Sequence, residues 1–176
     1  MKLLFSEAQL AHQPKQYMVH GRIVDPFETA ERPKTLLKAL AGVGLAPHEP
    51  TDHGREPIVA VHADHYVDFL GSAYEEFMRL PNHGPEVIPN AFPYYSADGD
   101  LTRRGPPRPT GILGRAGWYI GDLSCAMMER TFEAAYASAQ TAITGAEAIV
   151  AGERSAYALC RPPGHHAYRD RASGFC

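Results

Sequence analysis

Apolar side chains recur at helical spacing in three parts of the chain. The segment 32–43 carries leucines three and four residues apart, and Pro33 suits the first turn of a helix. The segment 58–74 has the same pattern, with Asp64 placed to cap it. The segment 131–150 is rich in alanine and carries a stripe of larger apolar residues. These patterns predict three helices, the last one long and packed on its apolar stripe.

Two short apolar runs predict buried strands. Leu3, Leu4 and Phe5 open the chain, and the segment 155–160 follows the last predicted helix after a glycine. The segment 7–30 between the first strand and the first helix is polar and irregular, which predicts a surface loop. Strands that are apolar throughout are typical of parallel sheets covered on both faces, so the chain is predicted to be α/β.

The segment 80–117 is rich in proline and glycine and has no helical or strand periodicity. A loop of this length within a compact domain is usually functional or disordered. Its arginines permit a phosphate or nucleic-acid contact, but a solvated insertion is the favoured interpretation. We therefore predict that residues 1–176 are part of one domain, with 80–117 inserted in it.

Composition narrows the classes of function. The 176 residues are 44% hydrophobic and 21% charged, which suffices for a soluble domain with a core. A net charge of -3 favours neither nucleic acid nor a membrane as an obligatory partner. The chain has an odd number of cysteines, without the C-x-x-C spacing: Cys125, Cys160 and Cys176. This argues against a disulfide framework or a zinc knuckle. A cytoplasmic location is predicted.

The candidate chemistry follows the predicted strand 155–160. Active sites of open α/β sheets lie at the carboxyl ends of strands, and this is where His165 and His166 stand next to each other. Adjacent residues of an extended strand point to opposite faces, so both imidazoles can serve one site only if the backbone turns. Two prolines and Gly164 precede the pair. The prolines restrict the backbone, and Gly164 permits an unusual conformation or a close approach.

Paired imidazoles suit proton transfer, because the unperturbed pKa of histidine is about 6.5. Repulsion between neighbouring imidazolium groups would separate their titrations, so that one ring stays cationic while the other carries protons. The alternative is a surface turn with two idle histidines. The preceding strand and the Pro-Pro-Gly segment favour the functional interpretation.

Several motifs resemble the histone deacetylase family, and within it the acetylpolyamine amidohydrolase branch. Arg161–Ala167, followed by Gly174, Phe175 and Cys176, is similar to the signature of that family. Further similarity to the family or to the branch lies in Lys2–Glu7, Pro26–Glu28, Arg32, Val61–Leu70 and Gly117–Tyr119. The resemblance covers the whole chain.

This resemblance implies a fold of the arginase-deacetylase type, a mainly parallel sheet with helices on both faces, of which the chain forms the amino-terminal part. It implies that His165 is an electrostatic partner and His166 the general base and acid. Phe175 would form one wall of the acyl-amine tunnel, and Gly174 would accept a hydrogen bond from the scissile amide. Arg32 would be a buried arginine beside the pocket through which acetate leaves.

The implied activity is that of a zinc-dependent amidohydrolase, which removes acetyl groups from acetylpolyamines or acetyl-lysine. The cofactors of such an enzyme would be Zn²⁺ and K⁺. The family's zinc ligands are an Asp-x-His pair and a later Asp, and we expect them beyond Cys176 and none in this chain. The implied assembly is a homodimer through 80–117. A non-catalytic fragment or an oligomer-assembly module of the same fold is the alternative.

The chain differs from the acetylpolyamine amidohydrolase branch at the positions that would bind a second positive charge of the substrate. Enzymes of that branch carry acidic residues on the insertion and after it, at positions that fall on Leu113 and Ser124 here. Neither side chain carries charge. Carboxylates that could replace them belong to Asp98, Asp100, Asp122 and Glu129. We therefore expect weak discrimination for a second positive charge on the substrate.

Overall fold

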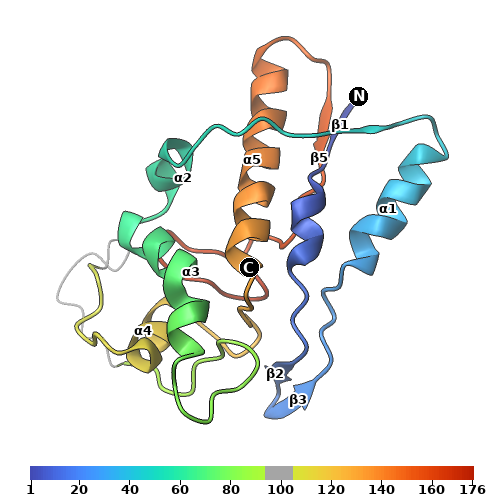
Figure 1. The fold of residues 1–176 in the computed structure, drawn as a ribbon. Coiled ribbons are helices and arrows are strands. Elements are labelled where there is room, and N and C mark those ends of the chain that lie inside the picture. The colour runs from blue at the N-terminus through green and yellow to red at the C-terminus, as the bar shows by residue number, and fades with distance from the viewer. Residues whose placement is uncertain (94–104) are drawn as a thin grey trace. The chain divides into compact units, whose positions relative to one another are not determined.

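The chain folds into two compact units in a computed structural model that describes residues 1–93 and 105–176 (Figure 1). The first unit comprises residues 1–13, 27–58 and 130–163, and the second comprises residues 14–26, 59–129 and 164–176. Each unit is therefore assembled from three separate stretches of the chain. The predicted site residues His165, His166, Gly174 and Phe175 belong to the second unit, whereas Arg32 belongs to the first.

The first unit is built on a parallel sheet with the strand order β4-β1-β5. Its strands are β1 (Lys2–Leu4), β4 (Pro47–His48) and β5 (Ala156–Ala158). Its helices are the 3-10 helix η1 (Glu7–Ala11), α1 (Glu31–Ala41) and α5 (Thr131–Val150). The predicted first strand, the predicted first helix and the predicted last helix are thereby confirmed, and β5 falls within the predicted strand 155–160.

Helices pack on both faces of this sheet, because successive residues of a strand point to opposite sides. Leu3 packs in a cluster with Leu37 and Leu40 of α1. On α5, a Cβ built on Gly145 would lie 3.5 Å from Leu4 and 3.3 Å from Ala158. The absence of a side chain at Gly145 therefore lets α5 approach the strands closely.

The buried face of α5 is not the predicted apolar stripe. Ile149 is 47% exposed and Val150 is 89% exposed. The buried residues of α5 are instead small or polar: Ala134, Ser138, Gln140, Thr141, Thr144, Gly145 and Ala148. Their polar groups are hydrogen-bonded, as buried polar groups must be. Gln9 donates to the hydroxyl of Thr141 (3.1 Å), and Gln140 accepts the backbone N–H of His53 (2.8 Å). Close packing and these bonds outweigh the apolar periodicity.

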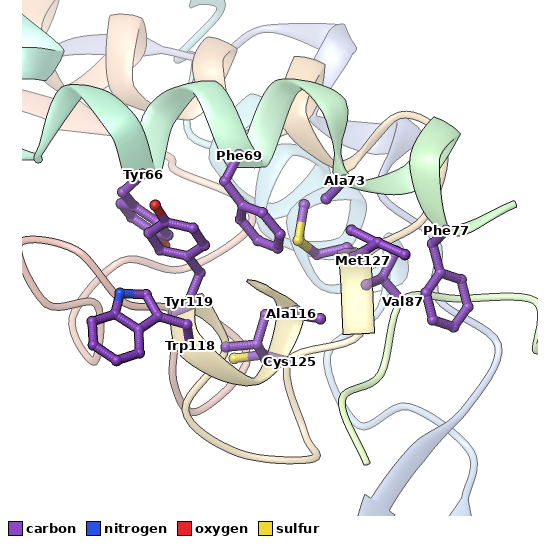
Figure 2. Packing of buried hydrophobic residues seen from close by; sticks show 13 residues of the cluster. Tyr66, Phe69, Ala73, Phe77, Val87, Ala116, Trp118, Tyr119, Cys125 and Met127 are labelled. Carbon is purple, nitrogen blue, oxygen red and sulfur yellow. The ribbon is translucent and has the colours of Figure 1, made fainter. Parts of the chain in front are cut away.

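The second unit consists mainly of short elements packed around aromatic side chains. Its elements are β2 (Tyr17–Val19), β3 (Arg22–Val24), α3 (Asp64–Phe77) and α4 (Ile112–Tyr119). Figure 2 shows Tyr66 and Phe69 of α3 directed towards Tyr119 of α4. The rings of Phe69 and Tyr119 are stacked with centroids 4.5 Å apart. This aromatic contact joins the two helices.

Three local predictions differ from the structure. The segment 7–30, predicted as a loop, contains η1 and the β2–β3 hairpin, whose His20-Gly21 turn has positive φ at both residues (52° and 75°). The predicted helix 58–74 is divided into α2 (Glu56–Val61) and α3, because Ala63 is extended with ψ 134°. Asp64 is consequently the first residue of α3 rather than its cap.

The predicted insertion 80–117 is partly helical. Its last residues, from Ile112 onwards, form the first turns of α4. Residues 94–104 of the insertion lie outside the described residues, and with them Asp98 and Asp100. In the described part of the chain, no helix is both long and apolar enough to cross a membrane.

Candidate functional site

The two histidines occupy the centre of a tight turn. The backbone N–H of Ala167 donates to the carbonyl oxygen of Gly164 over 3.0 Å. His165 and His166 are therefore the middle residues of a β-turn, which confirms the predicted change of backbone direction. Their ring centroids lie 4.3 Å apart with an interplanar angle of 61°. Both side chains are exposed in this chain. One loop therefore presents both imidazoles to a ligand.

A second tight turn lies against the first. The backbone N–H of Cys176 donates to the carbonyl oxygen of Ser173 over 3.0 Å, and the middle residues Gly174 and Phe175 have φ of 57° and 70°. Such left-handed values are easy for glycine but cost energy for a residue with a side chain. Phe175 is held in this conformation, and its ring packs on Tyr17 with centroids 4.8 Å apart.

Gly174 is the glycine whose lack of a side chain the site requires. A Cβ at this position would lie 2.8 Å from Cδ2 and 3.0 Å from Cγ of His166. Gly164, which we expected to have this role, has open space around it and a φ outside the left-handed region. The prediction for Gly164 is wrong because a close approach depends on what packs against the turn. Here the neighbour of the histidine turn is Gly174.

Asp122 holds the second turn in place. One oxygen, Oδ2, accepts the backbone N–H of Gly174 (2.7 Å) and the hydroxyl of Ser173 (2.8 Å). The other oxygen, Oδ1, accepts the backbone N–H (2.8 Å) and the hydroxyl (2.6 Å) of Ser124. Burial by itself would raise the pKa of Asp122, but these hydrogen bonds hold it below its usual range. The carboxylate is thus charged, and each of its oxygens accepts two hydrogen bonds within the second unit.

Asp122 was assigned no positioning role from the sequence. An aspartate side chain often accepts the backbone N–H two residues further on in a turn, and this tendency would have found the bond from the Ser124 N–H. The bonds to Gly174 and Ser173 span 52 and 51 residues. No local pattern predicts contacts over such a separation.

Backbone hydrogen bonds tie the remainder of the segment 164–176 to the second unit. The N–H of Ala172 donates to the carbonyl of Tyr119 (2.8 Å), and its own carbonyl accepts the N–H of Gly121 (2.7 Å). Nearer the histidines, the N–H of Ala63 donates to the carbonyl of Arg169 (2.9 Å). The His166 N–H donates to the sulfur of Cys176 (3.4 Å). The stretch between the two turns is therefore held by Ala63, the residue before α3, and by the end of α4.

The buried arginine of the first unit is Arg161, not Arg32. Arg32 is exposed in the first turn of α1, where Pro33 is the residue that turns inward. Arg161 is 2% exposed; its Nε donates to Glu28 (2.9 Å) and its Nη1 to the carbonyl of Gln9 (2.8 Å). Burial raises the pKa of Glu28, although the guanidinium groups of Arg161 and Arg32 oppose that rise. The expected burial of Arg32 is wrong, and its role in acetate release stays a prediction.

The metal-ligating residue types do not gather anywhere in the described ranges. Across residues 1–93 and 105–176, no group of three or more His, Cys, Asp and Glu side chains could hold a metal ion. Burial raises the pKa of Cys176, and also that of Cys125, whose sulfur donates to the carbonyl of Cys176 (3.4 Å). The surroundings of both thiols therefore disfavour the thiolate form.

Comparisons with known proteins agree with this architecture. Residues 26–176 match the family described as Histone deacetylase domain. The chain is 40% identical to the acetylpolyamine amidohydrolase of Burkholderia pseudomallei (strain 1710b), with 100% of the chain and 49% of that protein covered. It is 36% identical to the acetylpolyamine amidohydrolase of Mycoplana ramosa, with 100% of the chain and 50% of that protein covered.

A solved structure shows the same fold. The crystal structure of acetylpolyamine aminohydrolase from Burkholderia pseudomallei has a TM-score of 0.89 and 40% identity to this chain, over 100% of the chain and 49% of the other. The predicted fold, of the arginase-deacetylase type, is confirmed by this likeness. The chain spans about half the length of these relatives.

Proposed function

Because the chain belongs to the histone deacetylase family, we propose that the protein containing it hydrolyses acetylated amines to acetate and a free amine. The observation that supports this proposal is the turn 164–167, which presents two imidazoles 4.3 Å apart. The packing of Gly174 against His166 supports it further, because it gives one of the rings a fixed neighbour. Fixed orientation is what distinguishes a catalytic base from an idle surface histidine.

The histidine pair can move the protons that amide hydrolysis requires. His166 takes a proton from the attacking water as the new C–O bond forms, and it returns a proton to the amine nitrogen as the C–N bond breaks. His165, whose ring is adjacent, stabilises the negative charge that develops on the carbonyl oxygen. Phe175 and the carbonyl of Gly174, in the facing turn, hold the acyl amine.

The metal ions that the family resemblance predicts would need ligands other than the described residues. The family resemblance predicts zinc as the metal and K⁺ as a second ion. The described residues do not fit a metal site, since they bring no three ligating side chains together. The roles proposed for His165 and His166 therefore include no step that passes through a metal.

The experiment is His166→Ala in the full-length protein, assayed on an acetylated amine. Removal of an acid-base group should lower kcat by about two to four orders of magnitude. His48→Ala is the control, because His48 is exposed on β4 of the first unit. Turnover of His166→Ala close to that of the parent would contradict the proposed role. An inactive parent protein would instead favour the non-catalytic alternative.

For the substrate we propose an acetylated primary amine with a slim alkyl stem and little preference for a second charge. Leu113 and Ser124 are uncharged, and the Asp122 carboxylate is occupied by four hydrogen bonds. The attraction of a distant ammonium to a carboxylate is worth only about 1 kcal/mol at a solvated site. The test compares kcat/KM for a mono-acetylated diamine and an N-alkylacetamide of equal length. A preference of about a hundredfold for the diamine, or about 2.7 kcal/mol, would contradict the proposal.

We also propose that the segment 80–117 contributes to a homodimer contact. Its length and its prolines motivate this proposal; Val87 and the turns of α4 within the segment are packed in the core of the second unit. Light scattering on the full-length protein with this segment shortened should then show a monomer. A shortened variant that stays dimeric would exclude the segment as the contact.

A further inference from the structure

The β2–β3 hairpin contributes one fully buried side chain to the second unit. Tyr17, the first residue of β2, is 1% exposed, whereas every other residue of β2 and β3 is exposed or partly exposed. Ile23 of β3, for example, is 67% exposed. An isolated hairpin of two short strands is only marginally stable and needs a packing partner. The packing of this hairpin on the rest of the second unit therefore depends mainly on the Tyr17 ring.

The Tyr17 ring packs on Phe175, to which the family resemblance assigns one wall of the acyl-amine tunnel. The ring centroids lie 4.8 Å apart with an interplanar angle of 33°, and aromatic pairs attract each other at separations of roughly 4.5–7 Å. Phe175 itself is partly exposed and has φ 70°. Because a left-handed conformation costs energy for a residue with a side chain, Phe175 needs contacts that hold it there. The buried Tyr17 ring is such a contact.

One short segment of the backbone anchors both rings. The N–H of Met18, the residue after the tyrosine, donates to the carbonyl oxygen of Leu123 over 3.0 Å. The N–H of Gly174, the residue before the phenylalanine, donates to Oδ2 of Asp122 over 2.7 Å. Asp122 and Leu123 are consecutive, so the strand that carries one ring and the turn that carries the other are bonded to neighbouring residues. The position of the tyrosine ring relative to the phenylalanine ring is therefore fixed from both sides.

We propose that Tyr17 is a positioning residue, which sets the direction of the Phe175 ring and thereby the width available to the alkyl stem of the substrate. This inference rests on the proposed function, in which Phe175 holds the acyl amine. Since Tyr17 is buried, it acts through Phe175 rather than on the substrate itself. Without the tyrosine ring, Phe175 gains free space on one face, and the site no longer distinguishes a slim stem from a branched one.

The test compares kcat/KM for N-butylacetamide and N-isobutylacetamide in the full-length protein. These isomers differ in the width of the stem and not in composition or charge. One methylene group in a fixed apolar pocket changes kcat/KM by roughly tenfold or more, so we expect the parent to prefer the straight chain by about that factor. Tyr17→Leu should lose most of this preference. An unchanged ratio in Tyr17→Leu, or a parent without a preference, would overturn the proposal.

This ratio separates positioning from a merely structural role. Both substrates are hydrolysed by the same folded molecules, so a variant that only folds less well keeps the parent's ratio. Tyr17→Phe keeps the aromatic ring and should retain the preference. Phe77→Leu is the matched control for a lost buried ring, because Phe77 is 6% exposed in the same unit and its ring lies against His83 with centroids 6.4 Å apart. A loss of preference in Tyr17→Phe or Phe77→Leu equal to that in Tyr17→Leu would overturn the proposal.

Fluorine NMR tests the ring contact without a substrate. In the full-length protein labelled with para-fluorophenylalanine, the Phe175 signal is identified by its loss in Phe175→Leu. Tyr17→Leu should shift this signal, because it removes the aromatic ring whose centroid lies 4.8 Å away. A Phe175 signal that does not move in Tyr17→Leu would overturn the proposal. An inactive parent in which the signal does move would support the positioning of Phe175 and count against the proposed hydrolytic function.

Discussion

The contact between Gly174 and His166 leads to a prediction that separates backbone strain from catalytic geometry. Gly174→Ala would place a Cβ 2.8 Å from Cδ2 of His166, while ordinary contacts begin at 3.4 Å. The imidazole must therefore move by about 0.6 Å, or the turn must open. A misplacement of about 1 Å in a catalytic group can cost roughly a hundredfold in rate. We expect kcat of Gly174→Ala to fall by about tenfold to a hundredfold.

The same substitution also has a cost in stability. Gly174 has φ +57°, and a left-handed conformation costs a residue with a side chain about 1–2 kcal/mol. Gly21→Ala is a matched control, because Gly21 has φ +75° and nothing within 4 Å of the added Cβ. Gly21→Ala should lose about 1–2 kcal/mol in the free energy of unfolding, and Gly174→Ala should lose at least as much, because its Cβ also meets His166.

The assay is steady-state hydrolysis of an acetylated amine by the full-length protein, together with urea unfolding of the parent and both variants. Only Gly174→Ala should change kcat, since Gly21 lies in the turn of the β2–β3 hairpin. Normal kcat in Gly174→Ala would refute the inference that Gly174 positions His166. An equal loss of kcat in Gly21→Ala would show that reduced stability, rather than the displaced imidazole, lowers the rate.

Asp122 and His12 are titratable groups whose replacement should change stability. Asp122→Asn replaces the charged acceptor of the Gly174 N–H (2.7 Å) by an amide. We expect the free energy of unfolding, measured with urea, to fall by about 1.5–3 kcal/mol, and kcat to fall as well. An unchanged kcat would exclude Asp122 as the support of the turn. Burial, and to a lesser extent Arg161, lowers the pKa of His12 from 6.5 to about 4. The unfolded chain then binds the proton more tightly, so stability should fall by up to about 3 kcal/mol as the pH drops from about 6.5 to about 4. His12→Gln should reduce this dependence in urea unfolding measured across that range, and an unchanged dependence would contradict the assignment to His12.

The sequence alone determined those features that depend on neighbouring residues. The strand β1 and the parallel-sheet α/β class followed from short apolar runs, and the long helix α5 followed from apolar periodicity, because each pattern acts within a few residues of the chain. The turn at the histidines followed from the Pro-Pro-Gly segment before it, for the same reason. The family resemblance rested on motifs of this local kind.

The tertiary structure decided which groups meet across long separations. The buried face of α5 depends on partners such as Gln9, which lies 132 residues from Thr141, and periodicity cannot include such hydrogen bonds. The same holds for Arg161, which is buried because Glu28, 133 residues away, accepts its Nε–H. A side chain is excluded at Gly174 rather than at Gly164, because the second turn packs on the imidazole of His166. A sequence pattern contains the propensity of a segment, but burial and pairing are set by what the rest of the fold places beside it.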